Sequence, residues 1–333
     1  MLASVGNPMQ TMRSSNNSES AREAASSIAE KASFGVSQFT HWFQTFEQDV
    51  LLYKRLGVDT VELCERKLAH DPGQARAQLG FLKLLGLPVS SIQPRVHALF
   101  QDSMCADILE PAERMREFRN SIRLMSEFFP NVPMVTISGV APQFNFKLAH
   151  QTARKFYVEL ADYAADHGMR IMYEPLHPIL MNNNTFICTL KEAVLLIDAV
   201  QRDNFGLCLD LWHVWQEPLV EEQIQALGNR IFGVHISDWP PEQPRCLGDR
   251  RLPGEGCIPL SRLFHAIEKT GYKGAYSLEI FSEPTLPDSL WKQDPEQVIE
   301  RGRRGFYDAW LNRTSLNAPA RDIFTMSQHQ IQG

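Results

Sequence analysis

The sequence lacks three features that define large classes of protein. It has no stretch of roughly 18 consecutive apolar residues, the minimum length of a transmembrane helix. Lys and Arg number 33 against 39 Asp and Glu, a net charge of −6, so no broad basic surface can attract a nucleic-acid backbone. No Gly-x-Gly-x-x-Gly motif follows the first strand-like segment, which weakens a dinucleotide-binding fold. We therefore expect neither a membrane nor a nucleic acid as a partner.

Cysteine is also sparse, and no two cysteines form a Cys-x-x-Cys pair. Several lie inside apolar strand-like segments, where a reduced cysteine packs as a small hydrophobic residue. Residues 1–33 are small, polar and Ser-rich, and they lack the apolar core of a signal peptide. These observations predict a cytoplasmic protein with a disordered tail over residues 1–33. The six cysteines are Cys64, Cys105, Cys188, Cys208, Cys246 and Cys257.

From residue 34 onward, short apolar segments alternate with longer amphipathic ones. Such alternation predicts a parallel sheet, because each crossover helix must cover a face of the sheet. Eight units over about 280 residues fit a closed barrel better than an open sheet. The predicted fold is α/β, a single (β/α)8 TIM barrel over residues 34–311 with a mobile N-terminal tail and a C-terminal arm over 312–333. The predicted strands are residues 34–40, 60–65, 89–96, 133–139, 170–176, 205–211, 231–238 and 274–280.

Three acidic residues and a histidine stand near the ends of the last four predicted strands: Glu174, Asp210, His235 and Glu279. In such barrels the carboxyl ends of the strands form the active-site face. Any one of these residues alone would fit a local ion pair, but three buried carboxylates at one mouth need compensating positive charge. A divalent cation is the simplest compensator. The mostly oxygen ligand set favours Mn or Mg, with Co tolerated and Zn also compatible.

Histidines and tryptophans crowd the same predicted face. His213 follows Asp210 by three residues and so lies within reach of whatever Asp210 binds. His177 repeats this spacing after Glu174. His41 and His97 end the first and third strands, as structural or cavity-lining residues. Four tryptophans flank these positions as stacking surfaces for a sugar or as caps on the core: Trp42, Trp212, Trp215 and Trp239.

Five segments resemble the xylose isomerase-like barrel superfamily: YEPLHP, LCLDLWHVW, VHISDW, DRRLPGEG and YSLEIFSE. The resemblance spans residues 34 to about 311. This superfamily includes ketose 3-epimerases, hydroxypyruvate isomerases, inosose and dehydroshikimate dehydratases, and the endonuclease IV nucleases. The motifs are specific for the superfamily and much less so for any one branch.

The resemblance implies that the four strand-end residues hold one divalent metal ion. It also implies that Glu174 and Glu279 flank the reacting carbon as catalytic groups, while His213 and Arg250 contact substrate oxygens. The long loop after the seventh strand would then carry Arg250 or Arg251 over the metal.

The same loop bears on two further questions. Asp238 either orients His235 by a hydrogen bond or only caps the end of the strand. Members of the nuclease branch bind several zinc ions and carry a His where this chain has Arg251. Without that ligand a three-zinc site is incomplete, and the negative net charge also argues against a nuclease.

The leading functional hypothesis is a metal-dependent isomerase or epimerase of a small sugar, sugar acid or sugar phosphate. The metal would act as a Lewis acid that stabilises an enediolate. One glutamate would remove the α proton and the other would return it. Opposite faces give epimerisation, and transfer between adjacent carbons gives aldose–ketose isomerisation. No phosphate-binding glycine loop stands out, so the sequence leaves the substrate and its phosphorylation open.

A metal-dependent lyase is the alternative. Dehydratases of the superfamily use the same enolate to expel a leaving group. The EPLHP segment also resembles the large subunits of C-glycoside deglycosidases, which implies His177 as the base and a small second subunit. A barrel that binds a metal without catalysis would not need this many carboxylates around one cation. The expected partners are a small carbohydrate and a second copy of the chain in a homo-oligomer.

Overall fold

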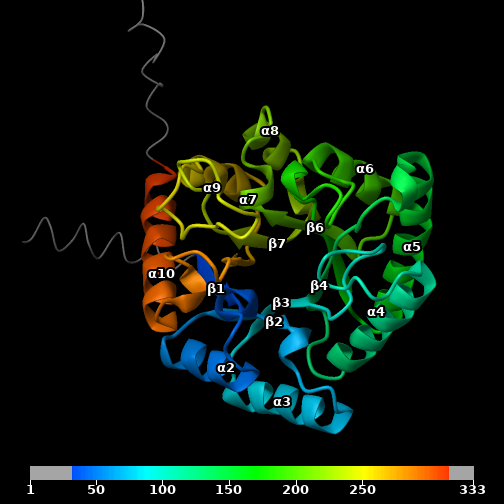
Figure 1. The fold of residues 1–333 in the computed structure, drawn as a ribbon, viewed down its shortest axis with the longest axis horizontal. Coiled ribbons are helices and arrows are strands. Elements are labelled where there is room, and N and C mark those ends of the chain that lie inside the picture. The colour runs from blue at the N-terminus through cyan, green and yellow to red at the C-terminus, as the bar shows by residue number, and fades with distance from the viewer. Residues whose placement is uncertain (1–31, 315–333) are drawn as a thin grey trace, which may run out of the picture.

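The computed structural model describes residues 32–314 of the chain. In this range eight parallel strands close into a barrel, each paired with the next and the last paired with the first. Helices surround the strands on the outside (Figure 1). The predicted (β/α)8 barrel is therefore confirmed. The predicted N-terminal tail, apart from its last residues, and most of the predicted C-terminal arm lie outside the described residues.

Each strand coincides with a predicted strand, but most end a few residues earlier than predicted. After β1, for example, the chain turns at once into a 3₁₀ helix over Gln38–His41, where hydrogen bonds are made along the chain rather than to the next strand. The strands are β1 (Ser33–Ser37), β2 (Thr60–Cys64), β3 (Val89–Gln93), β4 (Pro133–Thr136), β5 (Arg170–Tyr173), β6 (Phe205–Asp210), β7 (Ile231–Ile236) and β8 (Ala275–Leu278).

The helices begin at recognisable capping residues. Thr45 and Thr189 each form a capping box with the residue three positions on, which satisfies backbone N–H groups at the start of α2 and α6. The last helix begins at Pro295, where the side chain of Asp294 accepts the backbone N–H of Glu296. The helices are α2 (Phe46–Arg55), α3 (Pro72–Leu85), α4 (Pro111–Ser126), α5 (Phe146–Asp166), α6 (Leu190–Val200), α7 (Leu211–Val214), α8 (Val220–Gln225), α9 (Leu260–Lys269) and α10 (Pro295–Asn312).

Alternation along the strands divides apolar from polar side chains. Residues that face outward, such as Leu207 and Leu209 of β6, join the main core beneath the helices. Residues that face the barrel axis form a separate apolar cluster lower in the barrel, made of Val135, Met172 and Cys208. The next inward positions along β5 and β6 are Glu174 and Asp210. Because every second residue of a strand faces the barrel axis, Glu174 and Asp210 lie next to this apolar cluster, toward the carboxyl ends of the strands.

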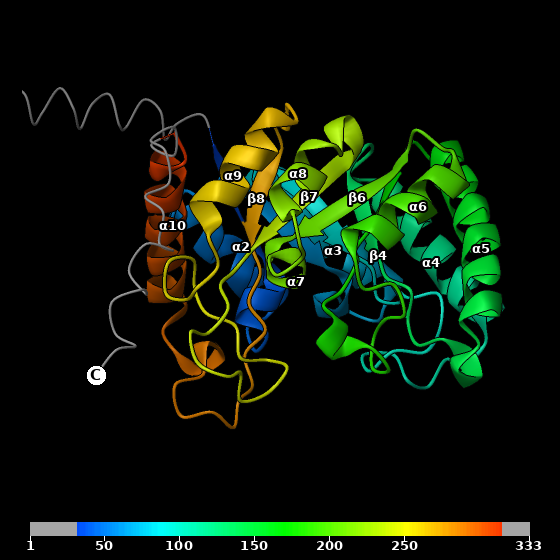
Figure 2. The ribbon, with the colours of Figure 1, turned by 90° about the horizontal axis from the view of Figure 1, so that it is seen from above.

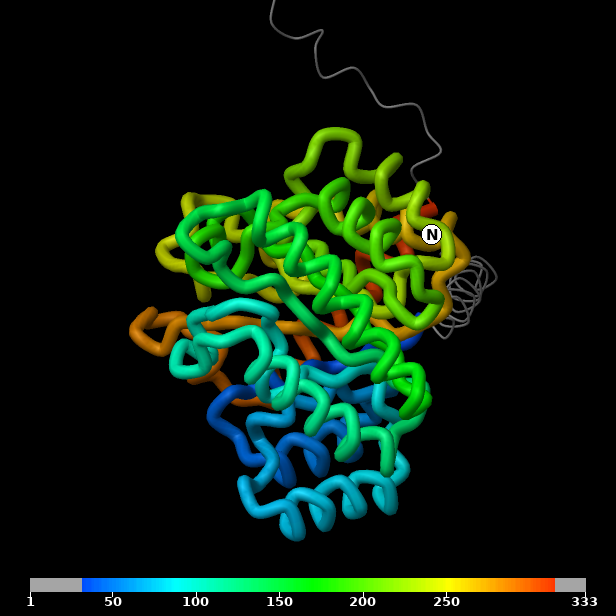
Figure 3. The backbone as a smooth tube through the Cα atoms, turned by 90° about the vertical axis from the view of Figure 1, so that its right-hand side faces the viewer, coloured from blue at the N-terminus to red at the C-terminus, as the bar shows by residue number. Residues whose placement is uncertain are grey.

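The long loops gather on one side of the barrel. Figure 2 shows the yellow loop that follows β7 and the orange loop that follows β8 hanging from the same side. Figure 3 shows α4, α5 and α6 packed in sequence around the outer wall. Within residues 32–314, none of the helices is long and apolar enough to cross a membrane.

Candidate active site

The structure brings together the four residues predicted as metal ligands. Glu174 directly follows β5, Asp210 ends β6, His235 lies in β7 and Glu279 directly follows β8. All four are buried. One ligand atom from each lies within 4.8 Å of the ligand atoms of the other three. Four adjacent strands therefore deliver three carboxylates and one imidazole to one point at the carboxyl end of the barrel.

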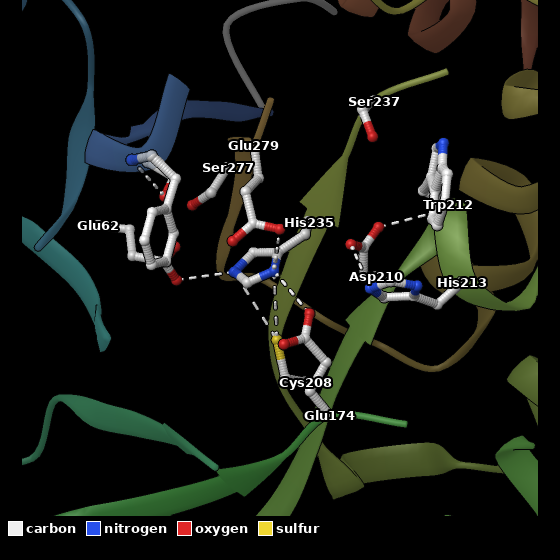
Figure 4. Close-up of polar contacts among 12 residues, drawn as sticks. Glu62, Glu174, Cys208, Asp210, Trp212, His213, His235, Ser237, Ser277 and Glu279 are labelled. Atoms are coloured by element: carbon white, nitrogen blue, oxygen red, sulfur yellow. Dashed lines mark hydrogen bonds and ion pairs between the residues drawn. The ribbon is translucent and has the colours of Figure 1, made fainter. Parts of the chain in front are cut away.

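The His235 ring lies at the centre of this cluster (Figure 4). Its Nδ1 is 3.1 Å from Glu174 Oε1 and 3.5 Å from Glu279 Oε2. Burial acts to lower the pKa of His235, but the neighbouring Cys208, Glu279 and Glu62 outweigh it and raise the pKa well above its ordinary value. The surroundings of the ring thus strongly favour a positive charge at this position.

The donor set fits a divalent cation with a preference for oxygen. Among the residues the structure describes, Arg250 is the only Lys or Arg within hydrogen-bonding distance of these carboxylates, and His235 and His213 also lie against them. One guanidinium and one protonated imidazole cannot balance three buried carboxylates, so a cation among their oxygens would lower the cost of burying them. Carboxylates plus one imidazole suit Mn, Mg or Co better than a thiolate site does.

A cysteine also lies close to the cluster. The Cys208 sulfur is 3.7 Å from both nitrogens of His235, and it could join Glu174 and His235 in a smaller ligand group. Burial, however, raises the pKa of the Cys208 thiol well above its ordinary value. The group of four offers more ligand atoms than this group of three, and its three carboxylates suit a hard divalent cation.

Of the two arginines predicted over the site, only Arg250 reaches it. Its Nη1 is 2.8 Å from Asp210 Oδ2 and 3.3 Å from Glu279 Oε2. The adjacent Arg251 points away and pairs with Asp249 at 2.8 Å. Neighbouring residues of an extended segment point in opposite directions, and Arg251 is not among the residues that line the cavity, so its position does not support the prediction that it binds substrate.

His213 is buried beside Asp210, as predicted. Its Nδ1 accepts a hydrogen bond from the backbone N–H of His177 at 3.1 Å. The neutral ring therefore carries its proton on Nε2, which lies 3.4 Å from Asp210 Oδ2. His213 also lines the cavity, so it is placed to contact a substrate while it holds Asp210.

His177 is less well placed than predicted. Its Nδ1 accepts a hydrogen bond from the backbone N–H of Ile179 at 3.0 Å. The centroid of its ring lies 4.8 Å from the ring centroid of Trp239 and 5.7 Å from that of Trp212. It is not among the residues that line the cavity. A base needs a free lone pair facing the substrate, and the one lone pair of neutral His177 is already engaged.

The two histidines at the ends of the early strands have different surroundings. His97 is buried, lines the cavity and has no hydrogen-bond partner for its Nδ1 among the described residues. His41 instead turns outward in the 3₁₀ helix after β1, and its Nδ1 lies 3.0 Å from the hydroxyl of Tyr53 in α2. The structure therefore places His97 in the cavity lining, whereas the position of His41 fits the structural alternative and not a contact with substrate.

A cavity of about 400 Å³ opens above the carboxylates, within the usual size range for small-molecule sites. Glu174, Glu279 and Arg250 form its polar floor. One wall is aromatic, and the indole nitrogen of Trp291 is fixed there by the backbone carbonyl oxygens of Phe39 and Ile280, each at 3.0 Å. Of the four tryptophans singled out in the sequence, Trp42 and Trp212 line the cavity, whereas Trp215 and Trp239 do not. The aromatic lining residues are Phe39, Trp42, Trp212, Phe281 and Trp291.

Glu62, a fully buried residue in the middle of β2, also belongs to this cluster and was not predicted from the sequence. Its Oε2 is 2.7 Å from Nε2 of His235. The sequence did contain a sign of this residue, because a single acidic residue interrupts the apolar strand TVELC.

Asp238, the partner suggested for His235, instead accepts backbone N–H groups of Gly254 and Ile258, both at 2.9 Å. Asp238 thus holds the long loop in shape, and Gly256 permits this packing because a Cβ there would overlap Asp238 and Trp239.

Comparison with known proteins shows similarity to several enzymes. The chain is 30% identical to inosose isomerase of Bacillus subtilis (strain 168) over 154 residues, 45% of this chain and 52% of that protein. It is 29% identical to 3-dehydroshikimate dehydratase of Pseudomonas aeruginosa over 238 residues, 68% of this chain and 34% of that protein. The matched part of the chain thus spans about half the length, or less, of these relatives.

The fold has solved counterparts as well. The structure of the IOLI protein, described with a bound zinc atom, superimposes with a TM-score of 0.68 at 20% identity and covers 84% of this chain and 98% of that one. A family model described as the xylose isomerase-like TIM barrel matches residues 50–309, which include the four strand-end residues. The chain therefore belongs to the xylose isomerase-like TIM barrel family.

Proposed function

We propose that this protein is a divalent-metal-dependent isomerase or epimerase of a small sugar, sugar acid or cyclic polyol ketone. The proposal rests on one observation above the others. Glu174 and Glu279, from β5 and β8, both line the cavity and lie against the same His235. Two carboxylates that flank one reacting position can remove a proton and return it, as stereochemical inversion or isomerisation requires.

Glu174, Asp210, His235 and Glu279 would hold the metal ion. When bound, the ion would supply Lewis-acid stabilisation of the negative charge that develops on a substrate oxygen. Arg250 and His213 both reach the cavity beside Asp210, where the guanidinium N–H groups of Arg250 can donate to substrate oxygens. The aromatic wall excludes water and can stack against the apolar face of a sugar ring. These residues together orient the substrate so that its α C–H lies between the two glutamates.

The first test measures metal binding and the role of one glutamate. We expect about one Mn²⁺, Mg²⁺ or Co²⁺ per chain, because one complete ligand set is present among the described residues. Glu279→Gln should abolish turnover and keep part of the metal binding, since an amide oxygen can ligate but cannot take up a proton. Glu127→Gln, a surface carboxylate paired with Arg76, is the control and should leave turnover unchanged. A wild-type rate in Glu279→Gln would remove Glu279 from the mechanism.

A lyase of the dehydratase type is the second candidate. It is favoured by the match to 3-dehydroshikimate dehydratase, which covers 68% of this chain. His177 is a poor base for this reaction, because its Nδ1 is engaged by Ile179 and its ring lies outside the cavity lining. A lyase built on this site would more readily use Glu174 or Glu279 to remove the proton before the leaving group departs.

The second test separates the two reactions. An inosose, a ketohexose and 3-dehydroshikimate would each be incubated with the Mn²⁺-loaded protein in deuterium oxide. An isomerase or epimerase should place solvent deuterium on carbon in the recovered ketone or in its isomer. Formation of an unsaturated product from 3-dehydroshikimate, with no exchange into the other two compounds, would refute the isomerase proposal in favour of the lyase.

A further inference from the structure

Glu62 is a buried carboxylate whose surroundings are built around it. It lies in the middle of β2 and faces the barrel axis with no exposed surface. Such a group is costly to bury unless donors surround it. Three donors do: His235 Nε2 at 2.7 Å and Ser91 Oγ at 2.7 Å approach Oε2, and Gln93 Nε2 approaches Oε1 at 3.4 Å. Two adjacent strands therefore cooperate to present one oxygen of Glu62 to His235.

The contact crosses the interior of the barrel. His235 comes from β7, which is separated from β2 by β8 and β1 in the closed sheet. The two ring nitrogens of His235 face opposite ways, Nε2 toward Glu62 and Nδ1 toward Glu174 and Glu279. Figure 4 shows the ring between Glu62 on one side and Glu174 on the other.

We propose that Glu62 is the positioning residue of the metal centre, which accepts the Nε2–H of His235 and so presents Nδ1 as the metal-binding nitrogen. This inference rests on the metal binding in the proposed function. An imidazole binds a metal through its unprotonated nitrogen, and the hydrogen bond at the other nitrogen decides which one that is. An ionised carboxylate can only accept, so its bond keeps a proton on Nε2, and Nδ1, which faces Glu174 and Glu279, is the nitrogen that would lose its proton to a metal ion.

The geometry argues against two other roles for Glu62. It does not belong to the group of side chains whose ligand atoms lie within 4.8 Å of one another, because the imidazole ring stands between Glu62 and that group. Glu62 is therefore not a fifth ligand. Nor does it only fill the core, because Gln93 Nε2 also lies 3.3 Å from Glu279 Oε1, which joins Glu62 to a second predicted ligand.

The test compares metal affinity and ring protonation in wild type and three variants. Glu62→Ala removes the acceptor, and Glu62→Gln keeps an oxygen that can accept the Nε2–H. Glu65→Gln is the matched control, since Glu65 is a second buried carboxylate that directly follows β2 and contacts Ser121 and Arg95 rather than His235. Co²⁺ dissociation constants would be measured by calorimetry, and the protonated nitrogen of His235 would be identified by ¹H–¹⁵N NMR of the Zn²⁺-loaded protein.

We expect Glu62→Ala to weaken Co²⁺ binding by about 10- to 100-fold, the usual effect of removing such a partner. Glu62→Gln should bind more tightly than Glu62→Ala, and Glu65→Gln should bind as wild type does. Wild-type protein should show the proton on Nε2. If Glu62→Ala fails to fold, the NMR measurement on the wild-type protein still decides the question.

Two results would overturn the inference. One is Co²⁺ affinity in both folded Glu62 variants equal to that of wild type, and the other is a proton on Nδ1 in the wild-type metal complex. Both leave metal-dependent catalysis intact. Failure of the wild-type protein to bind Co²⁺, Zn²⁺ or Mn²⁺ would instead defeat the proposed function itself, and the inference with it.

Discussion

Replacement of His177 by alanine separates a packing role from a catalytic one. The imidazole ring packs against Trp239 and Trp212, and its Nδ1 accepts the Ile179 N–H. The substitution removes these contacts. It leaves in place the backbone N–H of His177, which is the group that holds Nδ1 of His213. The substitution should therefore lower the free energy of unfolding, whereas the orientation of His213 beside Asp210 should not change.

The magnitudes follow from the contacts that are lost. Each aromatic contact contributes about 0.5 to 1.5 kcal/mol and the hydrogen bond about 1 kcal/mol, so the free energy of unfolding should fall by about 2 to 4 kcal/mol. A ring that only packs beside the cavity should change kcat by less than about tenfold. A general base would be worth about 100- to 10,000-fold in rate. The two interpretations thus differ by one order of magnitude or more.

The assay measures kcat with the best substrate of the panel and the urea midpoint of unfolding. His177→Asn is the control, because its side chain can still accept the Ile179 N–H and should regain part of the lost stability. The reasoning is refuted if His177→Ala folds with wild-type stability and loses more than about 100-fold in kcat, the effect expected of a base. That result would also promote the deglycosidase-like lyase.

Two further predictions concern buried charge. Arg250→Met should lower the free energy of unfolding of the metal-free protein by about 3 to 5 kcal/mol, because Asp210 and Glu279 lose their buried cationic partner. Added Mn²⁺ should raise the melting temperature of this variant more than that of wild type. Equal melting temperatures for the two metal-free proteins would contradict the prediction. Burial, aided by Lys67, lowers the pKa of His41 from 6.5 to about 3. Between these two pKa values the unfolded chain binds a proton at His41 that the folded protein does not. The free energy of unfolding is therefore unaffected by His41 above pH 6.5 and falls by about 1.4 kcal/mol per pH unit as the pH drops from 6.5 toward 3. Unfolding free energies from urea titrations should fall less steeply from pH 6 to pH 4 in His41→Asn, and parallel slopes would rule the explanation out.

The sequence predicted well whatever depends on local pattern. Strands appear as short apolar segments, and a polar residue at the carboxyl end of a parallel strand must lie at the active-site face. Glu174, Asp210, His235 and Glu279 could be assigned to one site because they end four consecutive strands, which the closed barrel places side by side. No knowledge of side-chain direction was needed.

Side-chain direction and long-range partners could not be predicted in the same way. The choice between Arg250 and Arg251 depends on an isolated bridge that pairs Arg251 with Asp238 and turns the two side chains apart. His41 ends the predicted first strand, but the 3₁₀ helix turns its ring toward α2. Glu62 stands 173 positions from His235 in the chain. Nothing in the sequence of β2 indicates which strand will lie across the barrel from it.

The site residues that the sequence did not reveal come from the first strands of the barrel, because these strands supply hydrogen-bond partners and not predicted ligands. The predicted ligands all come from β5 to β8 or directly follow these strands, whereas β2 and β3 supply Glu62 and Gln93, which contact His235 and Glu279, and Ser91, which contacts Glu62. A ring of eight strands brings these two arcs face to face across an interior wide enough only for side chains. His235 and Glu279 on one arc are therefore contacted by Glu62 and Gln93 on the other. Because hydrogen bonds act across the axis, substitutions in β2 should change metal affinity even though β2 contributes no predicted ligand.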